Sequence, residues 1–339
     1  MRVLDATSQS AAKDQAFQNL SSLLSDDVDA VEALLKARAA SPVSVIPDLS
    51  GYIVSAGGKR LRPLITLAAA RACGATDMEP VHSLATAVEF IHTATLLHDD
   101  VVDDSDLRRG KSAAKNVWGN SASILVGDFL FARAFTLMVE TGRLPVLDIL
   151  SNASTVIAEG EVHQLAVMGR LDLPTEDYLS IIEAKTAALF EAAARSGAVC
   201  ADADEAAVNA MSVYGKNLGL AFQLVDDALD YGGTTAVIGK KVGDDFRECK
   251  ITLPVVIARR RGNAEDKAFW DRALNPDTQS EDDLTHAIHL IRSTGAAEDT
   301  LAEARSYITI AKKALKTVPQ SDFVDALADL ADFCVDRAY

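Results

Sequence analysis

Apolar residues recur along most of this chain at the spacing of helices rather than in the alternation of strands. The apolar runs are rich in alanine and leucine, which both favour helix, and short polar segments with glycine or proline separate them. The pattern therefore predicts an all-α protein with a single large helical domain over residues 13–339, after a small, polar and frayed segment at residues 1–12.

A long helix is predicted over residues 79–104, after a helix over 62–73 that opens at Arg62-Pro63. A polar connection is expected over 105–120, and a loop rich in glycine and charge over 232–250. Three or four helices are expected near the C-terminus, and the others cover 16–39 (broken near 25–27), 121–140, 151–168, 175–200, 206–230 and 251–262.

The composition excludes several functional classes. With 339 residues and a net charge of −16, the chain would repel the phosphates of nucleic acids. Its four widely separated cysteines form no metal-binding pair, which predicts reduced thiols. The N-terminus lacks the pattern of a secretory signal, and no uninterrupted apolar stretch of about 20 residues marks a membrane span. We expect a soluble, cytoplasmic protein without a membrane span or a nucleic-acid partner.

Two aspartate clusters carry the strongest chemical signal. The pattern Asp-Asp-x-x-Asp occurs twice, each time after an apolar run of helical character. Side chains four residues apart share a helix face, so Asp99 points the same way as Asp103, and Asp226 the same way as Asp230. Like charges at this spacing repel by ~0.2–0.5 kcal/mol per pair, and negative charge at the end of a helix opposes the helix dipole.

Bound cations would offset both penalties. Ligation by carboxylate oxygens suits a hard ion such as Mg²⁺, which commonly links one or two carboxylates to substrate phosphates. The simpler interpretation is two solvated acidic helix ends in an acidic protein. The matched pair of clusters, together with the basic residues near them, favours metal binding.

Basic residues gather beside glycines and beside the first aspartate cluster. The run Gly57-Gly58-Lys59-Arg60-Leu61-Arg62-Pro63 places three cations within four positions at the start of a helix. Glycine permits a ligand to approach the backbone closely. Bidentate arginine side chains and the positive charge of a lysine are suited to binding a diphosphate. Each of the others alone is an ordinary solvated residue: Arg108, Arg109, Lys111, Lys185, Lys240, Lys241 and Lys250. Together these residues indicate two binding pockets for anions. In one pocket, metal ions would link the anion to both aspartate clusters, and in the other, basic side chains would bind the anion.

His92 precedes Asp99 by seven residues, which is two helical turns on the same face. From the spacing alone, a core histidine with satisfied hydrogen bonds is the simpler interpretation of His92, and a ligand contact is the alternative.

From about residue 45 onward the chain resembles the trans-isoprenyl diphosphate synthases, or polyprenyl synthetases. The run from Phe90 to Asp100, continued by Arg108-Arg109-Gly110, is similar to the first aspartate-rich motif of that family, and residues 219–231 are similar to the second. Residues 57–63, Lys185-Thr186 and 239–254 match as well. Five motifs in the same order make the resemblance specific. It is strongest to the bacterial octaprenyl, solanesyl and decaprenyl diphosphate synthases, which make the side chains of quinones such as ubiquinone.

The resemblance implies the isoprenoid synthase fold, a helical bundle around a central cavity, and a role for each matching position. About three Mg²⁺ ions would bind the allylic diphosphate through Asp99, Asp103 and Asp226. Support would come from Asp100, Asp227 and Asp230. Isopentenyl diphosphate would be held by Lys59, Arg62, His92 and Arg109. The allylic diphosphate would be held by Arg108, Lys185, Lys240 and Lys250, and the allylic cation would lie beside Thr186 and Gln223.

Two details bear on these implied roles. Cys249 stands where relatives usually have glycine, which puts the geometry of its loop in doubt. The family usually forms homodimers, so the resemblance also implies a homodimer here.

Product length follows from the residues just before the first aspartate. In the family, aromatic side chains four or five residues earlier block the product tunnel, whereas this chain has Thr95 and Ala94. It also lacks the two-residue insertion found in many bacterial farnesyl enzymes. A helix from Glu79 to Asp103 offers ~37 Å of tunnel wall, which together with these small side chains favours a product of about C40 to C50. The tunnel floor would involve one of three aromatics, which are otherwise ordinary core residues: Phe129, Phe131 and Phe135.

Several other functions stay open at this point. A geranylgeranyl or farnesyl diphosphate synthase would share the chemistry but stop earlier. A class I terpene cyclase would usually replace the second aspartate cluster and would not need the basic residues at 59–62. A non-catalytic partner subunit would typically lose one cluster, and a structural cation-binding protein would explain neither basic pocket. Consumption of isopentenyl diphosphate that requires an allylic primer and Mg²⁺ separates these alternatives.

Overall fold

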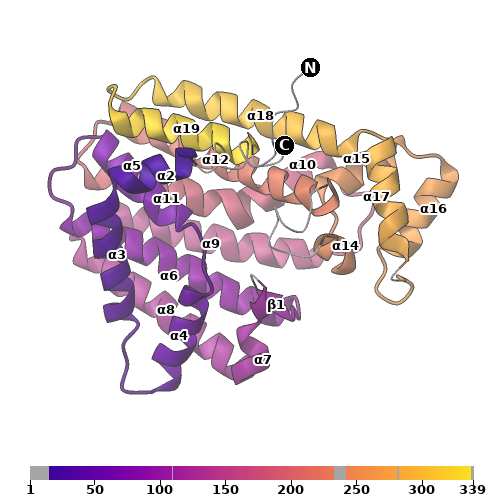
Figure 1. Ribbon diagram of the computed structural model, residues 1–339, viewed down its shortest axis with the longest axis horizontal. Coiled ribbons are helices and arrows are strands. Elements are labelled where there is room, and N and C mark those ends of the chain that lie inside the picture. The colour runs from indigo at the N-terminus through magenta and orange to yellow at the C-terminus, as the bar shows by residue number, and fades with distance from the viewer. Residues whose placement is uncertain (1–14, 109, 233–241, 281, 337–339) are drawn as a thin grey trace. The chain divides into compact units, whose positions relative to one another are not determined.

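The computed structural model describes residues 15–108, 110–232, 242–280 and 282–336 (Figure 1). The chain forms two compact units, each assembled from several segments. The first comprises Met1–Ser154, Leu189–Gly215 and Lys312–Leu330, and the second comprises Thr155–Ala188, Lys216–Ala311 and Ala331–Tyr339. The prediction of a single domain over 13–339 stays a prediction, and the predicted frayed segment at 1–12 lies outside the described residues.

Almost all elements of the first unit are helices. It contains α2 (Gln15–Leu23), α3 (Ser25–Arg38), α4 (Val45–Ser55), α5 (Leu61–Ala72), α6 (Glu79–Val102), β1 (Leu107–Arg108), β2 (Lys111–Ser112), α7 (Ala114–Trp118), α8 (Asn120–Glu140) and the start of α9 (Leu144–Ala166). It also contains nearly all of α11 (Ala188–Cys200), the start of α12 (Glu205–Gly232), the end of α18 (Ala296–Leu315) and most of α19 (Asp322–Asp336).

The second unit contains the remaining parts of these divided helices and several shorter elements. These are α10 (Thr175–Ile182), a π-helical turn η1 (Glu183–Ala187), α14 (Asp244–Arg247), α15 (Leu253–Arg261), α16 (Ala264–Ala273) and α17 (Asp283–Ser293). The all-α class and most of the predicted helices are therefore confirmed, including the break that separates α2 from α3.

Four local predictions were incomplete. The loop predicted over 232–250 contains the short helix α14. The predicted polar connection at 105–120 contains the antiparallel pair β1–β2 and the short helix α7. Helix α9 begins at Leu144 rather than at 151, because Pro145 in the first turn needs no backbone hydrogen bond there. The helix predicted for 175–200 is interrupted by η1.

Helix α6 is the core helix of the first unit. It packs against α3, α5 and α8, and most of its side chains from Val81 to Leu97 are buried. The partner helix α8 is, among the described residues, the one helix long and apolar enough to cross a membrane, and 39% of its most apolar window is buried. A core helix passes the same test, so this is weak evidence for a span, and the expected absence of a span stays a prediction.

A buried ionic contact joins α3, α5 and α6. Asp27 is 5% exposed and accepts hydrogen bonds from Nε and Nη2 of Arg71, both at 3.0 Å, and its Oδ1 lies 2.8 Å from Nε2 of His82. Burial raises the pKa of Asp27, but the hydrogen bonds from Arg71 and His82 outweigh burial and hold the pKa below its ordinary value. The ionised carboxylate therefore holds three helices of this unit together.

Close packing of α11 on α5 brings an aromatic ring to the start of α5. A Cβ atom on Gly197 would lie 2.5 Å from the backbone oxygen of Thr66, so only glycine permits this approach. Phe190 lies two turns before Gly197 on the same face of α11. Its ring lies under the guanidinium of Arg62, with 4.4 Å between the ring centroid and Cζ.

Candidate active site

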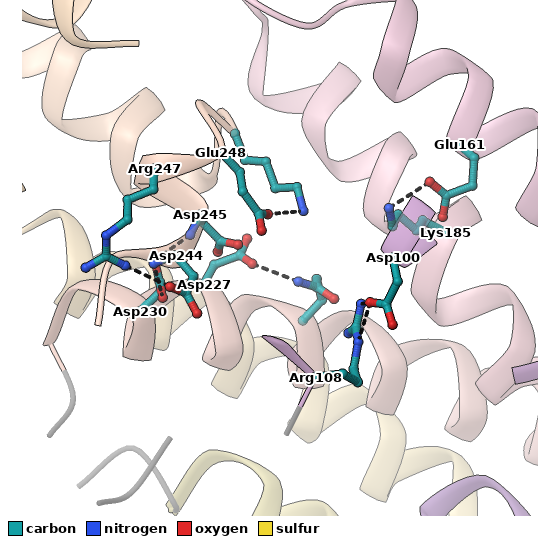
Figure 2. Close-up of polar contacts among 12 residues, drawn as sticks. Asp100, Arg108, Glu161, Lys185, Asp227, Asp230, Asp244, Asp245, Arg247 and Glu248 are labelled. Atoms are coloured by element: carbon teal, nitrogen blue, oxygen red, sulfur yellow. Dashed lines mark hydrogen bonds and ion pairs between the residues drawn. The ribbon is translucent and has the colours of Figure 1, made fainter. Parts of the chain in front are cut away.

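The first aspartate cluster occupies the C-terminal end of α6. Asp103 caps the helix, and its backbone N–H donates to the carbonyl of Asp99 at 2.8 Å. Asp100 is fully buried, and its Oδ1 accepts hydrogen bonds from Nε of Arg108 at 2.7 Å and from Nη2 of the same side chain (Figure 2). Asp99 and Asp103, by contrast, are partly exposed. In this cluster the second aspartate is therefore buried against Arg108, whereas the first and third are partly exposed.

Burial raises the pKa of Asp100, although its hydrogen bonds and ion pair with Arg108 act in the opposite direction. The second oxygen, Oδ2, is also buried and has no hydrogen-bond partner in the part of the chain that the structure describes. Arg108, predicted to hold the allylic diphosphate, is therefore already oriented by a buried carboxylate. Its diphosphate contact stays a prediction.

The second cluster, near the end of α12, resembles the first cluster at its first two aspartates. Asp226 is partly exposed, whereas Asp227 is 2% exposed. One oxygen of Asp227 accepts from the hydroxyl of Tyr178, and the other accepts from Nε2 of Gln223 at 2.8 Å. The Oε1 atom of Gln223 in turn accepts from Oγ1 of Thr186 at 2.9 Å. Two residues predicted to line the allylic cation therefore belong to one hydrogen-bonded chain that ends on a buried aspartate.

Burial, followed by the charge of Asp245, raises the pKa of Asp227 to about 8. Tyr178 was missed at the sequence level because a tyrosine in an amphipathic helix carries no local sign of its partner. Asp227 is 49 residues away along the chain.

Asp230 is turned toward the backbone of the following loop. Its two oxygens accept from the backbone N–H groups of Asp244 at 3.2 Å and Asp245 at 3.1 Å, and its carbonyl accepts from Gly243 at 2.9 Å. Burial and the nearby Asp245 raise the pKa of Asp230 to about 7. Asp230 thus differs from Asp226, with which it was predicted to share a face: it is 5% exposed and fixes the start of α14 (Figure 2).

The end of α14 explains the departure at Cys249. The N–H of Lys250 donates to the carbonyl of Asp245 at 2.9 Å and that of Cys249 to Phe246 at 3.0 Å, which is a Schellman termination. Cys249 has a φ of 53°, the left-handed conformation that glycine adopts most easily. The loop keeps the geometry expected of glycine although cysteine occupies the position. Nζ of Lys250 lies 2.6 Å from the carboxylate of Glu248.

The π-helical turn η1 positions Lys185 and Thr186. Such turns add a residue to a helix and often occur at functional sites. Nζ of Lys185 donates to Oε2 of Glu161 on α9 at 2.7 Å (Figure 2). Glu161 was not predicted as a site residue, because nothing in the local sequence links it to Lys185. Its neighbour Gly160 permits the close packing of α9 on η1: a Cβ atom there would lie 2.7 Å from the Cβ of Ala184 and 3.1 Å from the backbone nitrogen of Lys185.

Three of the predicted isopentenyl diphosphate residues, Lys59, Arg62 and His92, lie around the start of α5. Nη1 of Arg62 is 3.2 Å from Nε2 of His92 on α6, which brings two of these residues together. Lys59 lies above the ring of Phe17, with Nζ 5.3 Å from the ring centroid. The aromatic residues Phe17 and Phe190 were not predicted to take part. Two predicted residues lie outside the described residues, Arg109 and Lys240.

The residues predicted to set product length are placed on α6. Ala94 is 1% exposed, and Thr95 is partly exposed with its hydroxyl donating to the carbonyl of His92 at 2.8 Å. The three aromatics considered for the tunnel floor are all partly exposed on α8: Phe129, Phe131 and Phe135. Their roles in product length stay predictions.

The accessible carboxylates suit a hard divalent cation. Among the described residues, no three metal-binding side chains converge on one point. Asp99, Asp103 and Asp226 are nevertheless partly exposed, which fits a cation that takes its remaining ligands from substrate phosphates and water. The two clusters belong to different units, so the prediction of a cavity that they share stays a prediction.

A model of the family described as polyprenyl synthetase matches residues 43–291. The chain belongs to this family. It is 41% identical to the octaprenyl diphosphate synthase of Haemophilus influenzae, over 96% of this chain and 98% of that protein. The family predicted from the motifs is therefore confirmed, and with it the assignment of this polyprenyl synthetase as a prenyltransferase.

Solved structures agree with the family assignment. The polyprenyl synthase of Caulobacter crescentus, complexed with calcium and isoprenyl diphosphate, is 53% identical with a TM-score of 0.92, and covers 95% of this chain and 98% of its own. The decaprenyl diphosphate synthase of Rhodobacter capsulatus is 47% identical with a TM-score of 0.91, over 95% and 99% of the two chains. The predicted isoprenoid synthase fold of this polyprenyl synthetase is confirmed.

The packing of α9 on η1 can be tested with Gly160→Ala. The added methyl group would displace Ala184 and the backbone of Lys185, so we expect kcat/KM to fall by about tenfold and the melting temperature to drop. Steady-state kinetics and thermal unfolding measure both effects. In the matched control Gly51→Ala, the new methyl group meets no atom within 4 Å, so activity should stay unchanged and the helix should gain about 1 kcal/mol. Full activity in Gly160→Ala would contradict the positioning role of this contact.

Proposed function

We propose that this chain is a long-chain all-trans polyprenyl diphosphate synthase, which adds isopentenyl diphosphate units to an allylic diphosphate primer. The observation that carries the proposal is the same burial pattern at the first two aspartates of both clusters. In each, the second aspartate is buried and bound by the protein, and the first stays partly exposed. The likeness to octaprenyl and decaprenyl diphosphate synthases supports the same conclusion.

The proposal includes dependence on a divalent cation, Mg²⁺, with about three ions per site when substrate is bound. The Caulobacter relative is complexed with calcium and isoprenyl diphosphate, which supports a divalent cation. Asp99, Asp103 and Asp226 would hold the ions. When bound, the metal stabilises negative charge on the diphosphate leaving group.

The remaining steps belong to side chains of the protein. Arg62 and His92 would hold isopentenyl diphosphate, and Lys185 would move from Glu161 to the allylic diphosphate. The allylic C–O bond breaks as diphosphate leaves, and the isopentenyl double bond forms the new C–C bond. Loss of a proton to the released diphosphate then yields a product longer by one five-carbon unit. The paired Thr186 and Gln223 present fixed dipoles beside the allylic cation, from which water must be excluded.

Asp99→Ala tests the proposed chemistry directly. The variant should lose turnover while keeping the fold, because Asp99 is partly exposed at the end of α6. Incorporation of isopentenyl diphosphate with an allylic primer and Mg²⁺ measures turnover, and circular dichroism measures the fold. The control Asp29→Ala removes an exposed carboxylate from α3 and should leave activity unchanged. Near-normal elongation by Asp99→Ala would contradict the assignment.

The proposed product is about C40 to C50 in length, supported by the buried and small Ala94 on the ~36 Å length of α6. A geranylgeranyl or farnesyl diphosphate synthase is the alternative, and it would require a barrier close to the first aspartate cluster. Use of the product for quinone side chains is part of the proposal. The four cysteines are all free thiols in the structure, which supports the proposed cytoplasmic location.

Ala94→Phe should shorten the product to about C15–C20, because a phenyl ring at this buried position would fill the space into which the chain grows. Chromatography of the dephosphorylated products measures the length distribution. Ala94→Gly serves as the control and should keep the long product. An unchanged distribution in Ala94→Phe, with a folded enzyme, would remove position 94 from the tunnel wall.

A homodimer is the proposed assembly. One face of α8 packs against α6, while apolar side chains lie exposed on the other: Ile124 at 40%, Leu125 at 66% and Val139 at 63%. Val117 and Leu144, just outside the two ends of α8, are exposed as well. An apolar strip of this kind fits the matching strip of a second copy related by a two-fold axis.

Leu125→Asp should therefore shift the protein from dimer to monomer, because it places a charge within the proposed apolar contact. Sedimentation equilibrium measures the assembly. Leu23→Asp, on the exposed side of α2, is the control and should stay dimeric. A wild-type protein that sediments as a monomer would contradict the proposal.

A further inference from the structure

The loop before α5 contains three residues with positive φ, and one of them, Arg60, is not a glycine. Gly57 and Gly58 have φ values of 88° and 142°, and Arg60 has a φ of 46° and a ψ of 39°. The left-handed conformation costs a non-glycine residue about 1–2 kcal/mol. Such strain persists where the surrounding structure determines the conformation, and it often marks a functional site.

Arg60 supplies the contacts that hold this conformation. Its Nε donates to Glu32 on α3 at 2.9 Å, its Nη1 to Glu89 on α6 at 2.8 Å, and its Nη2 to the carbonyl of Val54 on α4 at 2.8 Å. The guanidinium thus contacts three helices, and each of its three nitrogens donates a hydrogen bond. Glu89 is 3% exposed, so its ion pair with Arg60 lies in the protein interior.

The Arg60 contact lies beside the contact between Arg62 and His92. Glu89 and His92 are three residues apart on α6 and therefore neighbours on one face. Arg60 and Arg62 are two residues apart at the start of α5, so two contacts between the same pair of segments lie next to each other. A shift of Arg60 would move the backbone that carries Lys59 on one side and Arg62 on the other.

We propose that Arg60 is a positioning residue of the isopentenyl diphosphate pocket, which binds no substrate itself and orients Lys59 and Arg62 through its contacts with Glu89 and Glu32. The inference rests on the proposed function. Burial lowers the pKa of Arg60, but Glu89 and Glu32 raise it further, above its ordinary value, so the side chain stays charged. A lysine at this position would keep the positive charge, but its single ammonium group cannot replace the planar guanidinium that donates to three partners.

Two variants test the proposal, Arg60→Lys and Glu89→Gln. Both should raise the KM for isopentenyl diphosphate, by about tenfold for Arg60→Lys and at least about threefold for Glu89→Gln, because an amide is a weaker partner than a carboxylate. Both should leave kcat and the KM for the allylic primer within about twofold of the wild-type values. Steady-state kinetics with each substrate varied in turn measure these constants.

Glu89→Gln separates positioning from direct binding. If Arg60 contacted the diphosphate itself, weakening its hold by Glu89 would leave the KM for isopentenyl diphosphate unchanged or lower it. Under the proposal the same variant raises this KM. The variant also carries the test if Arg60→Lys does not fold.

Arg71→Lys is the matched control. Arg71 lies on the same helix α5 and makes a bidentate contact with the buried Asp27, but it lies eleven residues away from the strained loop. This variant should lower the melting temperature while keeping the KM for isopentenyl diphosphate within about twofold. An equal rise in this KM would overturn the proposal, since general loosening would then explain the effect. A wild-type protein that elongates no primer would instead refute the proposed function.

Discussion

Buried or crowded carboxylates must be stabilised, and this requirement determines the surroundings of the two aspartate clusters. Each Asp-Asp-x-x-Asp cluster lies toward the C-terminal end of a long helix, where negative charge is disfavoured. Side chains of the protein stabilise two of these carboxylates. Arg108 donates hydrogen bonds to Asp100, and the Tyr178 hydroxyl and Gln223 donate to Asp227. The partly exposed aspartates in the same clusters are the positions at which we propose that divalent cations bind and lower the repulsion.

The buried aspartates also organise their surroundings. Asp227 connects to Thr186 through Gln223, so the buried carboxylate, the amide and the hydroxyl form one continuous network across α12 and η1. Asp230 ties the end of α12 to the backbone at the start of α14. Within the second unit, the hydrogen bonds of Asp227 and Asp230 thereby connect the elements that carry the proposed substrate contacts.

The helices and the aspartate clusters could be predicted because their signals are local. The apolar run that ends at Asp99 and the repeated aspartate spacing are visible in the chain itself. The partners of these residues could not be predicted, because Tyr178 and Glu161 meet Asp227 and Lys185 only through folding. The π-helical turn was missed for a similar reason: one extra residue in a helical turn leaves the hydrophobic pattern of a continuous helix almost unchanged. At Cys249 the side chain gave the wrong indication, and the hydrogen bonds of the helix end decide the left-handed backbone.

The length of the product made by the purified wild-type protein tests the account most directly. The protein would be incubated with farnesyl diphosphate, isopentenyl diphosphate and Mg²⁺, and the dephosphorylated products separated by chain length. The account predicts a ladder that ends at about C40 to C50, because Ala94 is small and the wall formed by α6 is long. A ladder that stops at about C15–C20 would contradict the open tunnel while keeping the chemistry. No elongation at all would contradict the central claim and favour a non-catalytic partner subunit.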